Sequence, residues 1–483
     1  MTSLLKNQAY INGKWIAASD HSTFEVINPA SGEIVEKVCD CSETEVKMAI
    51  DAAWNAWHSW KNRTAYDRCN LLRKWFELIL ENKMELADIM TMEQGKPLHE
   101  AEGEIQYAAS FVEWFAAEGI RTYGETIPAP ASKSRFVTIR QPVGVVAAIT
   151  PWNFPSAMIT RKVAPALAAG CSVIVKPSEE TPLSALALAA LAEKAGIPNG
   201  VLNVIPTKNA PLFSDVIFSD KRVRKISFTG STAVGKKLMK AAADNVKKIS
   251  LELGGNAPFI VFEDANIQQA IKGVRTAKFR NNGQACIAAN RIFIHETIYE
   301  EFAAKLVERV EKMRMGGGTE KGVELGPMIN KRACEKLDRL IADAVEKGAK
   351  ILNSNANNQK SGLFYPPVVL GNCTEEMDIF HEEIFGPVAA LYVFNDFDEV
   401  IKLANKTNFG LAAYLYSKDV ARCWTAAEQL EYGMTGINSG FISDASAPFG
   451  GIKESGIGRE GSRYGIDEYL EIKYMSFGGI SAH

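Results

Sequence analysis

Residues 143–175 read VGVVAAITPWNFPSAMITRKVAPALAAGCSVIV and predict a buried strand, a helix and a second buried strand. The short apolar runs at 143–149 and 172–175 are typical of strands, and 156–169 has the pattern of a helix. The alternation continues, with strands predicted at 201–205 and 225–228 and helices at 182–195 and 232–243. Strands that alternate with helices predict a parallel sheet, which binds ligands at the carboxyl ends of its strands.

Outside this region, a second α/β pattern extends from about residue 258 to residue 449. Two further segments have β character. Residues 127–141 are β-rich but interrupted by Pro128 and Pro130, and residues 469–477 alternate like a strand. Exposed strands are usually covered by a partner chain, so these segments predict an oligomer; two ordinary edge strands are the alternative.

The overall composition is that of a globular protein of two or three domains, because 483 residues exceed one compact core. The net charge of -3 and the absence of polybasic runs argue against a nucleic-acid or membrane partner. The first 15 residues lack the apolar core of a signal peptide. A cytoplasmic location is therefore expected.

The cysteines and histidines limit the chemistry. The 8 cysteines include no C-x-x-C pair, and reduced thiols are the expected state. None of the 6 histidines has metal-ligand spacing, and no metal site is expected. Because histidine is scarce, any general base is expected to be a carboxylate.

A glycine-containing loop, FTGSTAVGKK at 228–237, follows a predicted strand and opens a predicted helix. Such a helix start favours anions. The loop is one residue short of the triphosphatase pattern, and Lys237 stands where that pattern needs a hydroxyl for Mg²⁺. This argues against ATP or GTP hydrolysis, and an anion-binding loop and a plain helix cap remain alternatives.

Cys286 has a local sequence that suits a reactive thiol. Gly283 interrupts the preceding helical pattern, and the small residues Ala285 and Ala288 leave space around the sulfur. The apolar run that follows predicts Cys286 at a helix start, where the helix dipole would lower the thiol pKa. Most cysteines are structural, so an inert buried thiol is the alternative.

Six segments together carry a family resemblance. They are PWNFP at 151–155, KPSE at 176–179, ELGGN at 252–256, NNGQAC at 281–286, EEIFGP at 382–387 and PFGGIKESG at 448–456. In motif, order and spacing they resemble the aldehyde dehydrogenase family from end to end. The resemblance implies an α/β fold with three parts: a Rossmann-type cofactor domain at 1–121 and 143–254, an α/β catalytic domain at 255–454, and a small β oligomerisation arm at 122–142 and 466–483. It also implies a homodimer or homotetramer.

The resemblance assigns three catalytic residues. Cys286 would attack an aldehyde as a thiolate, and Asn153 would donate its amide to the resulting oxyanion together with the Cys286 N–H. Glu252 would activate the water that hydrolyses the thioester, with its pKa raised by burial between Leu251 and Leu253. From local sequence alone, a turn asparagine and a salt-bridged glutamate are the alternatives.

The implied cofactor is NAD, with NADP possible. Gly230 and Ser231 would contact the pyrophosphate, Lys176 and Glu179 the adenosine ribose, and Glu383 the nicotinamide ribose. The remaining residues assigned to the cofactor site are Trp152, Ser178, Leu253 and Phe385. A carboxylate at Glu179 repels a 2′-phosphate, whereas Lys176 tolerates one, so NAD is the expected preference.

Within the family, segments 155–162, 279–281 and 461–471 are most similar to succinate-semialdehyde dehydrogenases. That substrate has a distal carboxylate, which Arg161, Arg280 and Ser443 would bind. Solvent-exposed arginines are the alternative. Ala288 stands where the subfamily often has a second cysteine, so a disulfide with Cys286 is excluded.

Four other functions are alternatives to this assignment. Glutarate semialdehyde or another ω-carboxy aldehyde would use the same arginines. Acyl transfer to coenzyme A is disfavoured by the presence of Glu252. A non-catalytic binding protein on the same fold is disfavoured because Cys286 and Glu252 are both retained, and a triphosphatase is disfavoured by Lys237.

Overall fold

One half of the molecule is built on an eight-stranded sheet, in a computed structural model that describes residues 4–357 and 361–480. Its strand order is β19-β11-β10-β7-β8-β9-β1-β2. The strands are β1 (Ala9–Ile11), β2 (Lys14–Ile16), β7 (Val145–Ile149), β8 (Ser172–Lys176), β9 (Leu202–Val204), β10 (Val223–Thr229), β11 (Lys248–Glu252) and β19 (Gly456–Ile457). Strands β7 to β11 are parallel, as the sequence predicts.

Helices cover both faces of this sheet. Alternate residues of β7 enter different cores, with Val145 and Ala147 on one face and Val146 and Ala148 on the other. The first face carries α1 (Glu43–Trp60), α7 (Ala210–Ser219) and α8 (Thr232–Ala243). The second carries α2 (Ala65–Glu81), α3 (Lys83–Gln94), α4 (Leu98–Glu118), α5 (Ala157–Ala169) and α6 (Pro182–Lys194). This is the doubly wound arrangement of a Rossmann-type sheet.

The strand order reverses at β7, which lies between β8 and β10. Ile149 pairs with Lys176 on one side and with Phe228 on the other, and Thr229 pairs with Glu252. The carboxyl ends of four strands are therefore level, and the loops that follow them share one edge. Such a switch point is where open α/β sheets bind their ligands.

The sequence prediction of these elements is close. Helix α8 has the predicted bounds, and β10 is longer than predicted at both ends. Strand β7 begins at Val145, two residues later than expected, because Gly144 has a φ of +130°. Helix α5 is buried at every residue, Arg161 included, because α4 packs across it.

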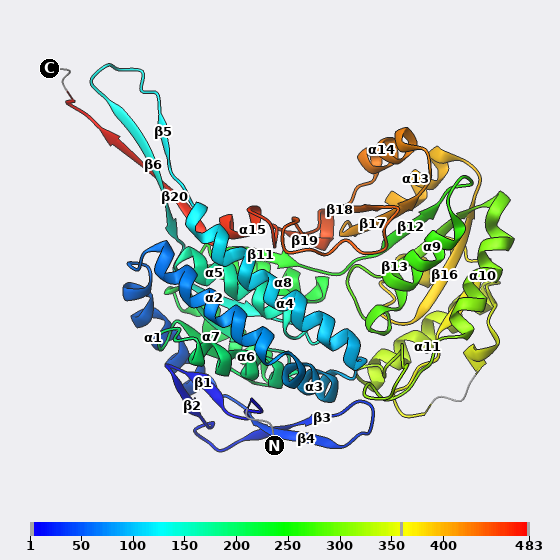
Figure 1. Ribbon diagram of the computed structural model, residues 1–483, viewed down its shortest axis with the longest axis horizontal. Helices are drawn as coiled ribbons and strands as arrows, with labels where there is room; N and C mark the ends of the chain where they lie inside the picture. Colours follow the sequence, from blue (N-terminus) through cyan, green and yellow to red (C-terminus); the bar gives the residue numbers. More distant parts are fainter. Residues whose placement is uncertain (1–3, 358–360, 481–483) are drawn as a thin grey trace.

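The second half contains a seven-stranded sheet in the order β14-β15-β16-β13-β12-β17-β18, parallel except for β14. Its strands are β12 (Ala257–Val261), β13 (Ala289–His295), β14 (Lys350–Ile351), β15 (Val368–Gly371), β16 (Val388–Phe394), β17 (Ala412–Tyr416) and β18 (Met434–Ile437). Its helices are α9 (Ile267–Val274), α10 (Tyr299–Glu311), α11 (Lys331–Glu346), α12 (Asp378–His381), α13 (Phe397–Asn405) and α14 (Val420–Gln429). Figure 1 shows this half beside the first.

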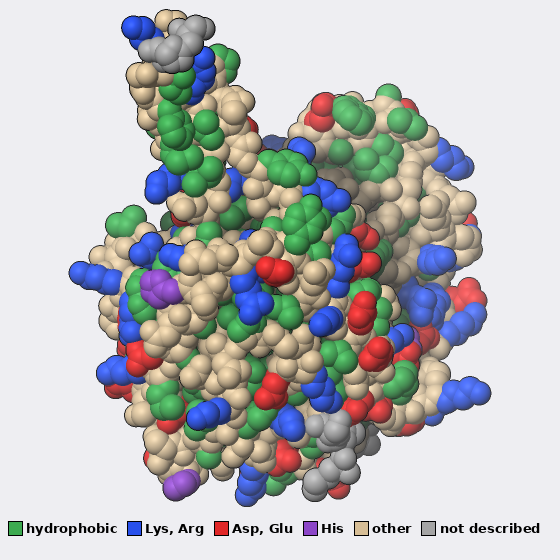
Figure 2. Space-filling model, turned by 60° about the vertical axis from the view of Figure 1, so that its left-hand side comes forward, with side chains coloured by type: hydrophobic (Ala, Val, Ile, Leu, Met, Phe, Trp, Pro, Cys, Tyr) green, Lys and Arg blue, Asp and Glu red, His purple; other side chains and the backbone are tan. Residues whose placement is uncertain are grey.

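A narrow antiparallel sheet projects from the first half (Figure 1). It consists of β5 (Glu125–Ile127), β6 (Arg135–Pro142) and β20 (Leu470–Phe477), and β20 pairs with β6 along its whole length. The two β-rich segments of the sequence are thus neighbours. Figure 2 shows hydrophobic side chains along this arm. The exposed large hydrophobic residues of its three strands are Ile127, Ile472, Tyr474 and Phe477. The last three residues of the predicted arm segment, 481–483, lie outside the described residues.

Two smaller elements complete the fold: the hairpin β3 (Thr23–Ile27) and β4 (Ile34–Cys39), and the short helix α15 (Tyr464–Asp467). In the part of the chain that the structure describes, the helices are too short or too polar to cross a membrane.

Candidate active site

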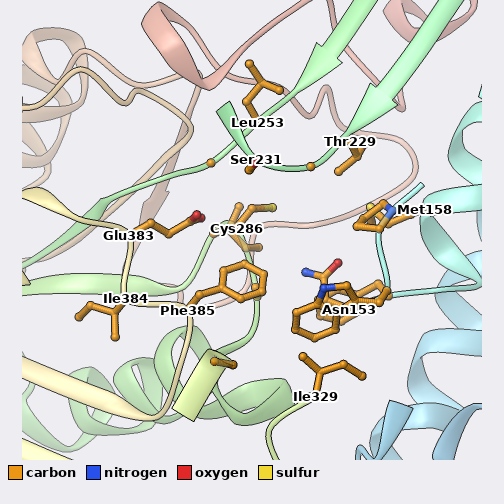
Figure 3. Close-up of a pocket in the computed structure, with 18 of the residues that line it drawn as sticks. Asn153, Met158, Thr229, Ser231, Leu253, Cys286, Ile329, Glu383, Ile384 and Phe385 are labelled. Atoms are coloured by element: carbon orange, nitrogen blue, oxygen red, sulfur yellow. The ribbon is translucent and has the colours of Figure 1, made fainter. Parts of the chain in front are cut away.

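A cavity of about 450 Å³ opens at the switch point of the first sheet, where the second half of the chain meets it. The loop after β7 contributes Trp152 and Asn153, and the loop after β10 contributes Gly230 and Ser231. Cys286 enters from the second half. In Figure 3, Cys286 lies between Glu383 and Asn153. The fold therefore brings together residues that are more than 200 positions apart.

The loop before Cys286 has an unusual backbone. Asn281, Asn282 and Gly283 have φ values of 51°, 57° and 74°, three successive left-handed residues. Asparagine and glycine tolerate this region best. A second turn follows at Cys286 and Ile287, and strand β13 begins two residues later, at Ala289. The predicted helix start at Cys286 is therefore wrong, because the following apolar run forms a strand.

Burial raises the pKa of the Cys286 thiol to about 12, and the Glu383 carboxylate adds to the shift. The sequence predicted the opposite direction. Without a helix N-terminus at the sulfur, no aligned dipole offsets the desolvation of the thiolate. The proton must therefore leave the thiol before it can attack.

Gly255, in the glutamate motif, lies against the turn at Cys286. A side-chain Cβ at Gly255 would lie 2.3 Å from the carbonyl oxygen of Cys286. Only glycine permits this close approach. The short distance between the glutamate motif and the cysteine loop therefore requires a glycine at position 255.

Asn153 is buried beside the cysteine loop. Its amide Nδ2 donates to the Gln284 carbonyl at 2.9 Å, and its own carbonyl accepts from Asn281 Nδ2 at 2.8 Å. The Lys96 ammonium donates to the same carbonyl at 2.9 Å. These bonds join the loop after β7 to the loop that carries Cys286.

Glu252 does not line the cavity in this conformation. It is 3% exposed, and its Oε2 has no hydrogen-bond partner among the residues that the structure describes. Burial, reinforced by the neighbouring Glu460, raises the pKa of Glu252 well above its ordinary value. The direction of this shift confirms the sequence prediction. Glu252 is near enough to Cys286 to influence the pKa of the thiol.

Six of the residues assigned to the cofactor line the cavity: Trp152, Gly230, Ser231, Leu253, Glu383 and Phe385. Ser231 caps α8 by accepting from the Val234 N–H at 3.4 Å. The Trp152 and Phe385 rings meet edge to face at 5.6 Å. Glu383 accepts from the Gly255 N–H at 2.9 Å, and burial raises the pKa of Glu383 to about 7.

The other three lie at the end of β8, outside the cavity lining. Lys176 is buried and pairs with Glu179 at 3.3 Å, which satisfies part of its charge. Ser178 is buried, and its hydroxyl accepts from the Glu180 N–H at 3.3 Å. Because β8 is next to β7, these residues extend the same edge of the sheet.

All three residues assigned to the substrate carboxylate line the cavity. Arg161 is 2% exposed, pairs with Glu460 at 2.9 Å, and retains an unpaired Nη2 among the described residues. Arg280 lies 5.2 Å from each of the Phe154 and Phe441 ring centres. Ser443 is buried.

Some residues of the site had no signal in the sequence. Tyr107 of α4 and Asn330, Arg332 and Lys336 at the start of α11 also line the cavity. Lys96 and Glu104 form a buried ion pair, and Glu104 Oε1 accepts from the Ser156 N–H at 3.0 Å. Only long-range packing brings these residues to the site, so local patterns did not identify them.

We expect Glu104→Ala to lower the free energy of unfolding by about 3–5 kcal/mol, because it leaves the buried Lys96 ammonium without its partner. Chemical denaturation measures the change. Glu102→Ala is the matched control, because Glu102 lies on the same helix as Glu104 but forms a more exposed ion pair, with Lys83 of α3. Loss of this pair should lower the free energy of unfolding by at most about 1 kcal/mol. Equal effects of the two variants would contradict the assigned role of the buried pair.

The doubly wound sheet, with a cavity at its switch point that a second α/β half closes, is the arrangement of a nucleotide-dependent dehydrogenase. The chain belongs to the aldehyde dehydrogenase family, whose model matches residues 15–475.

Its relatives are similar over their full length. It is 52% identical to a 3-sulfolactaldehyde dehydrogenase of Pseudomonas putida, over 99% of this chain and 98% of the relative. It is also 52% identical to a glutarate-semialdehyde dehydrogenase of Pseudomonas aeruginosa, over 99% of both chains. The crystal structure of a succinate-semialdehyde dehydrogenase from Burkholderia pseudomallei matches with a TM-score of 0.97 and 53% identity, over 99% of both chains.

Proposed function

We propose that this protein oxidises succinate semialdehyde to succinate with a nicotinamide dinucleotide. The observation that carries the proposal is that Arg161 and Arg280, the two arginines assigned to the substrate, both line the cavity that contains Cys286. A buried guanidinium binds a carboxylate through paired hydrogen bonds, which an uncharged aldehyde cannot form. The three named relatives are all called dehydrogenases of aldehydes with an anionic group.

In the proposed reaction, Cys286 loses its proton and attacks the aldehyde carbonyl, which forms a thiohemiacetal. The Asn153 amide and the Cys286 N–H stabilise its oxyanion, and each donor contributes about 3 kcal/mol. A nicotinamide dinucleotide bound at the carboxyl edge of the first sheet would supply the acceptor for the hydride. The acyl group then remains on Cys286 as a thioester.

Glu252 is proposed as the base that activates water for hydrolysis of the thioester. Its raised pKa suits proton transfer near neutral pH. Its side chain must rotate toward Cys286, because it does not line the cavity in the present conformation.

The residues present fit the proposed cofactor. The N-terminal end of α8 opens on the cavity at Gly230 and Ser231, and a helix N-terminus attracts a pyrophosphate. Lys176, Ser178 and Glu179 would hold the adenosine ribose, and Glu383 the nicotinamide ribose, with Trp152, Leu253 and Phe385 along the path. NAD is the proposed preference because of the Glu179 carboxylate, and Lys176 allows NADP.

Glutarate semialdehyde is the second candidate substrate. It has the same terminal carboxylate on a chain one carbon longer, and one relative is named for it. The test is a steady-state comparison of succinate semialdehyde, glutarate semialdehyde and butanal with each cofactor. A wild-type enzyme that shows no preference for the carboxylated aldehydes would refute the proposed substrate class.

Arg280→Ala is expected to lower kcat/KM for succinate semialdehyde about 100-fold, because two charge-assisted hydrogen bonds to the carboxylate are lost. The value for butanal should change less than about threefold, since butanal makes no such bonds. Arg280 is a cleaner test than Arg161, whose removal also takes from the buried Glu460 one of its two cationic partners, the other being Lys162.

The matched control for Arg280→Ala is Arg275→Ala. Arg275 is five residues earlier, pairs with Glu324, and does not line the reaction cavity. Its removal should leave both substrates unaffected. An equal loss for succinate semialdehyde and butanal in Arg280→Ala would contradict the carboxylate role.

The domain and assembly roles are proposed on the same basis. The cofactor domain would comprise 1–121 and 143–254, the catalytic domain 255–454, and the arm 122–142 and 466–483. The exposed hydrophobic side chains of the arm support a homodimer or homotetramer in which a partner chain covers them. The cysteines of the described residues form no disulfide, which supports a reducing compartment such as the cytoplasm.

A further inference from the structure

Tyr107 is a cavity residue with an unused polar group. It lies on α4, and its buried hydroxyl makes no well-aligned hydrogen bond with the residues that the structure describes, although the Ser443 hydroxyl lies close to it. Leaving such a group unpaired destabilises the folded protein. A phenylalanine at this position would avoid that cost. The hydroxyl is therefore available to hydrogen-bond a molecule in the cavity.

The ring of Tyr107 is held in a fixed orientation. It meets the Phe111 ring edge to face at 4.9 Å, and it packs against the cluster of Ala108, Ala157 and Met158. Phe111 in turn lies 5.1 Å from the Arg161 guanidinium. The phenol is therefore preorganised beside Arg161, one of the arginines that line the cavity.

The surroundings of the hydroxyl are positively charged. Arg161, Arg280 and Ser443 all lie near Tyr107 and line the same cavity. Burial nevertheless raises the pKa of Tyr107, so the phenol keeps its proton at neutral pH and can donate it. A neutral donor among two guanidinium groups and a hydroxyl matches an anion with several acceptor oxygens.

We propose that the Tyr107 hydroxyl donates a hydrogen bond to the carboxylate of the substrate and is a specificity-determining residue for anionic aldehydes. This inference rests on the proposed function. The carboxylate has about four lone-pair directions, so Tyr107 can bind alongside the two guanidinium groups without displacing either. The bond is lost for an aldehyde with a methyl group in place of the carboxylate.

Tyr107 also lies at a junction. Together with Phe154 and Arg280, it lines a second cavity of about 340 Å³ that extends toward His99 and Glu324. The three shared residues separate this space from the cavity of Cys286. The polar ends of Tyr107 and Arg280 therefore mark the limit of the reaction cavity, which is where the far end of a short chain must bind.

The test is Tyr107→Phe, which removes one oxygen and keeps the ring packing. We expect KM for succinate semialdehyde to rise about tenfold with kcat little changed, because one hydrogen bond to a charged group is lost in both ground and transition states. KM for butanal should be unchanged. The inhibition constant of butanoate, which has the carboxylate but no aldehyde, should rise by the same factor.

The control is Tyr392→Phe. Tyr392 also has a buried hydroxyl without a partner among the described residues, but it belongs to the core of the second sheet and does not line either cavity. Its kinetics should equal those of the wild type. Unchanged KM and butanoate inhibition in Tyr107→Phe, or an equal rise in KM for butanal, would overturn the inference. Failure of the proposed function would appear separately, as a wild-type enzyme without preference for carboxylated aldehydes.

Discussion

Cys286→Ala should lower the formation of reduced cofactor by at least about 10⁴-fold, which is the largest effect expected from a single substitution in this protein. Without the sulfur no thiohemiacetal forms, and a direct hydride transfer from hydrated aldehyde has no activated group to start from. Absorbance of the reduced nicotinamide measures the rate. Binding of the cofactor should persist, because Gly230 and Ser231 are untouched.

Cys334→Ala is the control, since Cys334 is the other partly exposed cysteine. It lies on α11 and should be replaceable with little loss of rate.

Because burial raises the pKa of Cys286 to about 12, inactivation of the wild type by iodoacetamide should accelerate with pH, about tenfold per unit near neutrality. If Cys286→Ala forms reduced cofactor at the wild-type rate, the assignment of Cys286 as the nucleophile is wrong.

Glu252→Gln should lower the steady-state rate by about 10²–10³-fold while leaving the first turnover largely intact. The glutamine keeps the shape of the side chain but cannot take a proton from water, so the thioester accumulates. Rapid mixing should reveal a burst of about one reduced cofactor per active site, followed by a slow phase. Mass spectrometry of the quenched protein should find the acyl group on Cys286.

The pH dependence tests the same residue. Because burial raises the pKa of Glu252, the basic form becomes more abundant as pH rises through that raised value, and deacylation in the wild type should accelerate accordingly. Glu252→Gln should lose this dependence. Glu454→Gln, at an exposed carboxylate paired with Lys236, should retain it. If Glu252→Gln slows the burst as much as the steady state, Glu252 acts before hydrolysis and the assignment is wrong.

Part of the first sheet was predictable because β7, β8 and β10 are short apolar runs, each followed by a helix. Strand β8 and helix α8 lie where the pattern predicts them, whereas the strand order that creates the switch point is seen only in the structure. The sequence alone therefore indicated that the residues after β7 and β10 lie at the same edge of the sheet, where the carboxyl ends of the strands meet. Arg161 and Arg280 were predicted to share a cavity only through the family resemblance.

The errors arose where tertiary structure overrides local pattern. The apolar run after Cys286 suits a helix or a strand, and a turn of three left-handed residues at 281–283 selects the strand. The inverted pKa expectation for Cys286 followed from that single error. The orientation of Glu252 away from the cavity depends on contacts with the 449–460 segment, which no local pattern contains.

The hydrogen bonds between the loop of Asn153 and the loop of Cys286 join two halves of the molecule that have separate cores. During synthesis, residue 153 leaves the ribosome long before residue 286, and Phe449 on the cavity wall emerges later still. A nascent chain therefore contains Asn153 before it contains the thiol, and it contains both of them before the part of the cavity wall that Phe449 provides. The chemistry begins only after both halves have folded and docked, so an incomplete chain cannot trap aldehydes on its cysteine through this site.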